Sequence, residues 1–245
     1  EMSYFAHPGS KPINPKFVFH WADEKNNIVS DWRKIAEDFL SIPMAHKMVG
    51  FFTVADRGDN ILKVMRSYQY YAADGISHRY YEEEKKNEVY VDNYRKGGFV
   101  WHTTGSGKTM TSYKATRNLL MDIPSIEKTV FLIDRKDLDM QTKMAFQSYA
   151  DNDTIDVDDT ENVDALIRRM ADGNRQMIVT TRQKLQTMIT KKLQEGTKEY
   201  EKIRNLRVAF VVDECHRAVT PETKRRIERF FAHSLWYGFT GTPIF

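Results

Sequence analysis

The amino-acid sequence predicts an α/β fold in which a parallel sheet lies between two layers of helices. Five short apolar runs, several of them β-branched or aromatic, are separated by stretches long enough for a helix. These runs are residues 98–102, 129–133, 177–180, 208–212 and 235–239. Repeated strand and helix units indicate a three-layer parallel sheet, in which chemistry lies at the carboxyl ends of the strands.

Length and composition limit the class of protein. The 245 residues are 41% hydrophobic and 29% charged, which is typical of a globular chain with a full hydrophobic core. No apolar run approaches the roughly 20 residues that span a bilayer, and residues 1–12 carry no secretory signal, so we expect a cytoplasmic protein. A net charge of +3 does not by itself indicate DNA binding. The single cysteine, Cys215, excludes an internal disulfide and a multi-cysteine zinc site.

The N-terminal part is predicted to be a small lead-in region, residues 1–60. A helical pattern begins behind Ser30 and Asp31, both suitable N-caps, and the polar residues 56–60 are typical of a loop. Beyond this loop the pattern changes to a long helix at 66–90 and then to the strands. We therefore expect the sheet domain to cover residues 61–245.

The segment after the first strand has the pattern of a phosphate-binding loop. A strand leads into it and an apolar helical pattern follows it, which is the context that such a loop requires. Its residues are Thr104, Gly105, Ser106, Gly107, Lys108 and Thr109. We expect Lys108 to reach the β and γ phosphates of ATP and the Thr109 hydroxyl to ligate Mg²⁺. The strict pattern has glycine where this chain has His102, and a plain glycine turn is the alternative.

Two carboxylates follow the most apolar strand. The run at 208–212 continues into Asp213, Glu214, Cys215 and His216. Carboxylates beside a buried strand are costly unless they bind ions. With a phosphate loop upstream, we expect Asp213 to hold Mg²⁺ through water, Glu214 to act as general base on the attacking water, and His216 to sense the γ phosphate. The alternative is a strand end whose acids meet solvent.

Arg66 and Gln69 lie at the start of the long helix. A glutamine amide both donates and accepts hydrogen bonds, so this pair is expected to contact the adenine edge. A capped helix start with packed tyrosines is the alternative.

The last strand runs into Thr240, Gly241 and Thr242, which offer two hydroxyls and a tight turn. Together with the phosphate loop and the acids, this segment is expected to couple nucleotide state to movement. Alone, it is only a junction between a strand and a turn.

Polar groups and cations also follow two other strands. Arg135 and Lys136 come after the strand at 129–133, and Thr181 and Arg182 come after the strand at 177–180. Such groups suit contacts with DNA phosphates, and helix N-caps with ordinary surface charge are the alternative. A nuclease centre at Asp74, Glu83 and Lys85 is not expected, because no apolar strand lies beneath these residues.

Taken in order, six segments resemble the first RecA-like lobe of superfamily two helicases and translocases, over residues 62–245. They are RSYQYYA, WHTTGSGKT, FLIDRKDLDMQT, IVTTRQKL, DECH and FTGTPIF. The loop, the DRKDLD segment, DECHR and GFTGTPIF are similar to HsdR, the restriction (R) subunit of type I restriction-modification enzymes. His102 is usual in the R-subunit version of the loop.

The resemblance implies a P-loop NTPase that uses ATP and Mg²⁺, with Lys108, Asp213 and Glu214 as its catalytic residues. It also implies an R subunit that assembles with methyltransferase and specificity subunits, translocates double-stranded DNA and cuts it at a distance. A nuclease domain is expected before this segment and a second motor lobe with an arginine finger after it, so hydrolysis by this lobe alone is expected to be weak. The alternatives are another DNA or RNA helicase, such as a DEAH-like enzyme, and a nucleotide-dependent subunit-interaction lobe without turnover.

Overall fold

A six-stranded sheet forms the centre of the computed structural model, and every neighbouring pair of its strands is parallel. The structure describes residues 3–5, 12–15, 18–85, 97–103, 105–133, 136–151, 153, 157–215 and 220–241. The strand order is β5-β10-β9-β6-β8-β7. The strands are β5 (Gly98–Trp101), β6 (Lys128–Ile133), β7 (Val157–Asp159), β8 (Gln176–Thr181), β9 (Arg207–Val212) and β10 (His233–Thr240).

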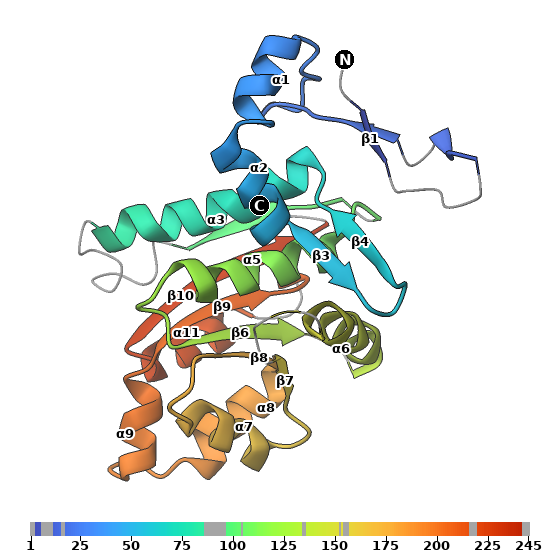
Figure 1. Cartoon of the computed structure of the whole chain (residues 1–245). Coiled ribbons are helices and arrows are strands. Elements are labelled where there is room, and N and C mark those ends of the chain that lie inside the picture. The colour runs from blue at the N-terminus through green and yellow to red at the C-terminus, as the bar shows by residue number, and fades with distance from the viewer. Residues whose placement is uncertain are drawn as a thin grey trace.

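Alternate side chains of these strands enter two separate cores. Phe131 and Val211 belong to the core between the sheet and α3, α5 and α6, whereas Val130 and Phe210 belong to the core between the opposite face of the sheet and the other helices. Figure 1 shows α3 and α5 above the sheet and α7, α8 and α9 below it. A buried parallel sheet needs apolar side chains on both faces, which is why the strands read as continuous apolar runs.

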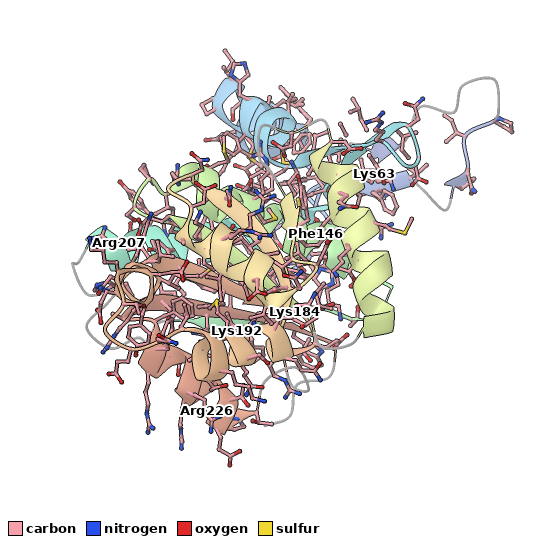
Figure 2. All side chains as sticks on the ribbon, turned by 90° about the horizontal axis from the view of Figure 1, so that it is seen from below. Lys63, Phe146, Lys184, Lys192, Arg207 and Arg226 are labelled. Atoms are coloured by element: carbon pink, nitrogen blue, oxygen red, sulfur yellow. The ribbon has the colours of Figure 1, made fainter. Side chains whose placement is uncertain are left out.

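The helices of the upper layer are α3 (Ser67–Lys85), α5 (Lys108–Asp122) and α6 (Lys136–Ala150). The lower layer contains α7 (Val163–Ala171), α8 (Arg182–Thr187), the π-helix η2 (Met188–Lys192), α9 (Lys198–Arg204) and α11 (Pro221–Phe230). Figure 2 shows the chain from below, with Lys184, Lys192 and Arg226 labelled on this lower layer. Among the described residues, no helix is both long and apolar enough to cross a membrane.

The predicted three-layer α/β architecture is confirmed, and each of the five apolar runs is a strand. The sixth strand, β7, was not expected, because a single valine followed by two aspartates carries no apolar strand pattern. The long helix starts at Ser67, one residue from its expected start. The predicted helix behind Asp31 is α1 (Trp32–Asp38), and Asp31 caps it by accepting a hydrogen bond from the Arg33 N–H.

The N-terminal part packs onto the upper layer. It contains a hairpin of β1 (Ser3–Phe5) and β2 (Val18–His20), helix α2 (Ile42–Phe51), and a second hairpin of β3 (Thr53–Asp56) and β4 (Ile61–Val64). Trp21, Phe52 and Val54 share one core with Tyr113 and Leu119 of α5. This part of the chain therefore has no core separate from that of the sheet.

The expected boundary between residues 60 and 61 lies in the turn of the β3–β4 hairpin, where Asp56 pairs with Ile61. The hairpin is fixed to α6, since the Asp56 carboxylate accepts a hydrogen bond from Ser148 Oγ at 2.6 Å. Ser148 Oγ also accepts one from the Gly58 N–H at 2.7 Å. The polar residues 56–60, expected to be a loop, therefore include the turn of this hairpin, and the division of the chain into a lead-in and a sheet domain stays a prediction.

Candidate functional site

The loop between β5 and α5 has the backbone that a phosphate-binding loop needs. Gly105 and Gly107 have φ angles of 79° and 80°, in the left-handed region that glycine adopts without steric cost. Helix α5 begins directly after them at Lys108, and Gly107 offers no side-chain cap. The N-cap residue therefore supplies no side-chain acceptor for the first N–H groups of α5, and a helix terminus of this kind is well suited to an anion.

Helix α3 holds this loop from one side. The Gln69 amide donates to the Ser106 and Gly107 carbonyls at 3.2 and 3.3 Å, and Tyr68 Oη donates to the Ser106 carbonyl at 2.8 Å. A Cβ atom at Gly107 would lie 2.5 Å from Gln69 Nε2. The glycine is thus required both for its φ angle and for this close approach.

Gln69 Oε1 accepts a hydrogen bond from the Arg66 N–H at 2.9 Å, as expected of a residue that caps the start of a helix. The Gln69 side chain is buried, and both ends of its amide contact backbone groups. Its contact with adenine stays a prediction, and the sequence could not show that this amide also supports the phosphate loop.

His102 lies beneath the same loop and is 4% exposed. One ring nitrogen, Nδ1, is 2.5 Å from Ser106 Oγ, and the other, Nε2, is 3.0 Å from Thr111 Oγ1. Burial lowers the pKa of His102 below its usual value, and the nearby Lys108 ammonium adds to this effect. The imidazole ring beneath the loop is therefore neutral at neutral pH.

The two acids predicted to follow the buried strand meet Lys108. Lys108 Nζ lies 3.2 Å from Asp213 Oδ1 and also forms an ion pair with Glu214. Asp213 continues the register of β9, since its N–H donates to the Leu132 carbonyl at 3.0 Å. Burial raises the pKa of Asp213, although Lys108 acts in the opposite direction. The buried carboxylate is therefore stabilised by a proton or by a nearby positive charge such as that of Lys108.

Glu214 has a φ angle of 45°, in the left-handed region that residues other than glycine adopt rarely. Its N–H donates to Asp213 Oδ1 at 3.0 Å, so the two acidic residues fix each other's orientation. Strained backbone of this kind is concentrated at functional sites.

The segment expected to couple nucleotide state to movement contacts the residues that lead into the phosphate loop. Strand β10 lies between β5 and β9, and the Thr240 carbonyl accepts a hydrogen bond from the His102 N–H at 2.8 Å. The Trp101 indole N–H donates to the Gly241 carbonyl at 3.2 Å. Trp101 was not singled out in the sequence, because its partner lies far along the chain.

The remaining residues of the predicted site fall into two groups, those that the structure describes and those that lie outside the described part of the chain. Thr109 lies in the first turn of α5, half-buried. The residues Thr104, Arg135, His216 and Thr242 lie outside the described part of the chain, as does the side chain of Lys136. Thr181 caps α8 by accepting a hydrogen bond from the Lys184 N–H at 3.3 Å, which is the structural alternative raised for it. Contact of Thr181 or Arg182 with DNA stays a prediction.

Two cavities, each lined in part by Arg66, adjoin the loop. One, of about 610 Å³, is lined by Phe19, Phe39, Arg66, Gln69, Gly107 and Met110, among others. The other, also about 610 Å³, is lined by Tyr68, Trp101, His102 and Ser106, among others. The Arg66 guanidinium lies 3.6 Å above the centre of the Phe19 ring. Phe19 of the lead-in region thus lines a cavity beside the phosphate loop, and no sequence motif indicated this.

A dense cluster of metal ligands is absent from the part of the chain that the structure describes, where no group of three His, Cys, Asp or Glu side chains could hold an ion. Mg²⁺ commonly binds through one or two carboxylates together with phosphate oxygens and water. Thr109 and Asp213 stay the predicted ligands of such a site. Asp74, considered for a nuclease centre, is instead ion-paired with Lys47 at 2.5 Å.

Comparison with known proteins gives a consistent family. The sequence model of the SWI2/SNF2 ATPase family matches residues 68–245. The type I restriction enzyme SauCOLORF180P endonuclease subunit of Staphylococcus aureus strain COL is 35% identical over 245 residues, which are 100% of this chain and 24% of that protein. The chain thus spans about a quarter of the length of this relative.

A second relative is covered almost completely. It is the C-terminal part of the putative type I restriction enzyme MpnIIP endonuclease subunit of Mycoplasma pneumoniae, and it is 34% identical over 213 residues, which are 86% of this chain and 99% of that protein. Among solved structures, a nuclease-deletion mutant of the Type ISP restriction-modification enzyme LlaGI in complex with a DNA substrate mimic has a TM-score of 0.48 and 17% identity, over 75% of this chain and 18% of that one.

Proposed function

Because the chain belongs to the SWI2/SNF2 ATPase family and to the endonuclease subunits of type I restriction enzymes, we propose that it is the first lobe of an ATP-driven DNA translocase. In this proposal the lobe supplies half of an ATP site, and a second lobe supplies the rest. The observation that carries the proposal is the meeting of Lys108, Asp213 and Glu214 at the phosphate loop.

The ammonium of Lys108 has two kinds of partner available. In the structure it is held by carboxylates, and the loop beside it presents uncapped N–H groups of α5. Phosphate oxygens would compete with these carboxylates for Lys108, because charge-assisted hydrogen bonds to phosphate are similarly strong. Lys108 would then bind the β and γ phosphates, and the carboxylates of Asp213 and Glu214 would no longer be paired with it.

The released carboxylates have distinct roles in this proposal. Asp213, together with the Thr109 hydroxyl and the phosphates, would hold Mg²⁺, and Glu214 would accept a proton from the attacking water. When bound, Mg²⁺ supplies positive charge that neutralises the phosphate oxygens. Asp213 is the more buried of the two acids, and a buried carboxylate is stable only beside a cation, which supports its assignment as the ligand.

The base of the nucleotide would enter the cavity on the Phe19 side of Arg66. This cavity adjoins Gly105, Ser106 and Gly107 and has apolar walls from the lead-in, which suits a flat, largely apolar ring. Arg66 is oriented by its contact with Phe19 and could lie against the base. Gln69 would then support nucleotide binding in two ways, by its hydrogen bonds to the phosphate loop and by contact with adenine.

The wider activity is proposed from the relatives. Their names describe endonuclease subunits of type I restriction enzymes. We therefore propose that the whole protein acts on double-stranded DNA with methyltransferase and specificity subunits, and that hydrolysis drives translocation before cleavage. Arg135, Lys136, Thr181 and Arg182 are the residues of this lobe proposed to contact DNA. Thr240, Gly241 and Thr242 would couple hydrolysis to movement.

The test is a measurement of ATP hydrolysis and of translocation in the full-length subunit with its partners and double-stranded DNA. Lys108→Ala and Glu214→Gln should each abolish both activities. The matched controls Lys191→Ala and Glu195→Gln change exposed residues of the same types, remote from the loop in sequence, and should retain them.

The rival functions predict different outcomes. Unwinding of a duplex without translocation-dependent cleavage would favour another helicase. Nucleotide binding without hydrolysis in the assembled complex would favour an interaction lobe. Unchanged hydrolysis in both site variants would contradict the assignment of Lys108 and Glu214.

A further inference from the structure

We propose that His102 is a positioning residue that joins the two ends of the phosphate loop through its two ring nitrogens. The inference rests on the proposed nucleotide function and extends it to a residue that contacts no phosphate. In the strict loop pattern this position is glycine, which has no side chain to make such contacts.

The ring of His102 bridges the loop to its helix. Nδ1 meets the hydroxyl of Ser106 within the loop, and Nε2 meets the hydroxyl of Thr111 in the first turn of α5. Each hydroxyl also contacts a backbone carbonyl of the loop. Thr111 Oγ1 lies 3.1 Å from the Gly107 oxygen, and Ser106 Oγ is hydrogen-bonded to the Thr103 oxygen. One imidazole therefore orders both the entry to the loop and its exit into the helix.

The count of protons restricts this network. If both hydroxyls donated to their carbonyls, both ring nitrogens would have to donate, and the ring would carry a positive charge. Burial beside Lys108 disfavours that charge. The neutral ring has one donor and one acceptor, so one hydroxyl must give its proton to the ring. The bridge is therefore directional, and each tautomer secures one end of the loop more firmly than the other.

The remaining contacts of His102 explain why the ring keeps its place. Its N–H donates to the Thr240 carbonyl, and its ring packs against the edge of Tyr68 with centroids 5.7 Å apart. The Tyr68 hydroxyl donates to the Ser106 carbonyl, so the same tyrosine supports both the ring and the loop. His102 thus connects the loop, helix α3 and strand β10.

The experiment uses the full-length protein and measures the dissociation constant for a slowly hydrolysed ATP analogue with Mg²⁺. His102→Gly introduces the residue of the strict pattern, and we nevertheless expect it to weaken binding by about 10- to 100-fold, since two hydrogen-bonded links are lost. His78→Gln, which changes an exposed histidine on α3, is the control and should bind as the wild type does.

Two conservative variants separate the two links. A glutamine amide reaches the place of Nε2, whereas an asparagine amide reaches only that of Nδ1. We expect His102→Gln to depend on the Thr111 hydroxyl and to be weakened further by Thr111→Val. His102→Asn should depend on the Ser106 hydroxyl and be weakened further by Ser106→Ala. A residue with a merely space-filling role would show no such pairing.

A second measurement does not require nucleotide. Amide hydrogen exchange across residues 102–111 should be faster in His102→Gly than in the wild type, because the loop loses its bridge. Equal exchange and equal affinity in His102→Gly and the wild type would overturn the proposal for His102. A different result would overturn the proposed function instead: the wild type binds no nucleotide, although its amide exchange across residues 102–111 is still slower than that of His102→Gly.

Discussion

The ammonium of Lys108 is ion-paired with the carboxylate of Asp213, with Nζ and Oδ1 3.2 Å apart, although the two residues belong to different strand-to-helix connections. Strands β5 and β9 both flank β10 in a parallel sheet, so their carboxyl ends open on the same edge. Glu214 contacts the same ammonium. If phosphates bind Lys108 as proposed, they compete with both carboxylates for its ammonium.

Glu214→Gln is expected to separate binding from turnover. The amide removes the proposed general base, a role worth about 10²- to 10⁴-fold in rate, and it also removes the charge that is proposed to compete with phosphates for Lys108. We expect hydrolysis to fall by that factor while the affinity for Mg²⁺ and ATP stays equal or increases. Parallel measurements of hydrolysis and of equilibrium binding would show this. A loss of binding equal to the loss of rate would contradict the assignment.

The two glycines of the loop form a matched pair for substitution. Both have left-handed φ angles, but a Cβ at Gly105 meets nothing within 4 Å, whereas a Cβ at Gly107 lies 2.5 Å from Gln69 Nε2. Each alanine should reduce the free energy of unfolding by about 1–2 kcal/mol through its backbone angle. Gly107→Ala should lose more, because Gln69 must also move. Chemical denaturation measures both, and equal losses would mean that the Gln69 contact is unimportant.

Asp213→Asn is expected to stabilise the fold while it removes function. Burial raises the pKa of Asp213 above its usual 3.8. The protonated carboxyl therefore stabilises the fold fully below pH 3.8, and this stabilisation is lost as the pH rises through the raised pKa. At neutral pH the buried charge is a cost that a neutral amide avoids. Thermal unfolding should shift upward, whereas Mg²⁺-dependent hydrolysis should disappear. The control Asp164→Asn, an exposed partner of Lys192, should change neither.

His102 should make stability depend on pH in the opposite sense. Burial lowers the pKa of His102 below 6.5, so the unfolded chain takes up its proton first as the pH falls. The stabilisation by the neutral ring is complete above pH 6.5 and is lost as the pH falls through the lowered pKa. Denaturation of the wild type and of His102→Gln above and below pH 6.5 tests this. A constant difference between them across that range would show that His102 does not titrate as inferred.

The sequence predicted the architecture of the sheet well, because strands buried on both faces are apolar along their whole length. It also named the residues that meet at the loop, since phosphate-loop glycines and a strand-end pair of acids have characteristic spacing. The structure brings Lys108, Asp213 and Glu214 together, and their chemical roles stay predictions.

Other features depend on contacts that no local pattern carries. The polar residues 56–60 indicate a loop but not the β3–β4 hairpin around it, because the packing of that hairpin against α6 involves Ser148, far along the chain. Phe19 belongs to a short apolar stretch with no motif, yet it lies beside Arg66. Gln69 was identified by its amide, but the backbone partners of that amide are visible only in the fold.

The most direct test of the account is equilibrium binding of ATP with Mg²⁺ to the full-length protein and to its Lys108→Ala variant, with Lys191→Ala as the control. Loss of a charge-assisted contact of about 1.5–3 kcal/mol should weaken binding by roughly 10- to 100-fold. We therefore expect affinity to fall by that factor in Lys108→Ala and to stay unchanged in Lys191→Ala. Equal affinity in all three proteins would contradict the placement of the nucleotide at this loop.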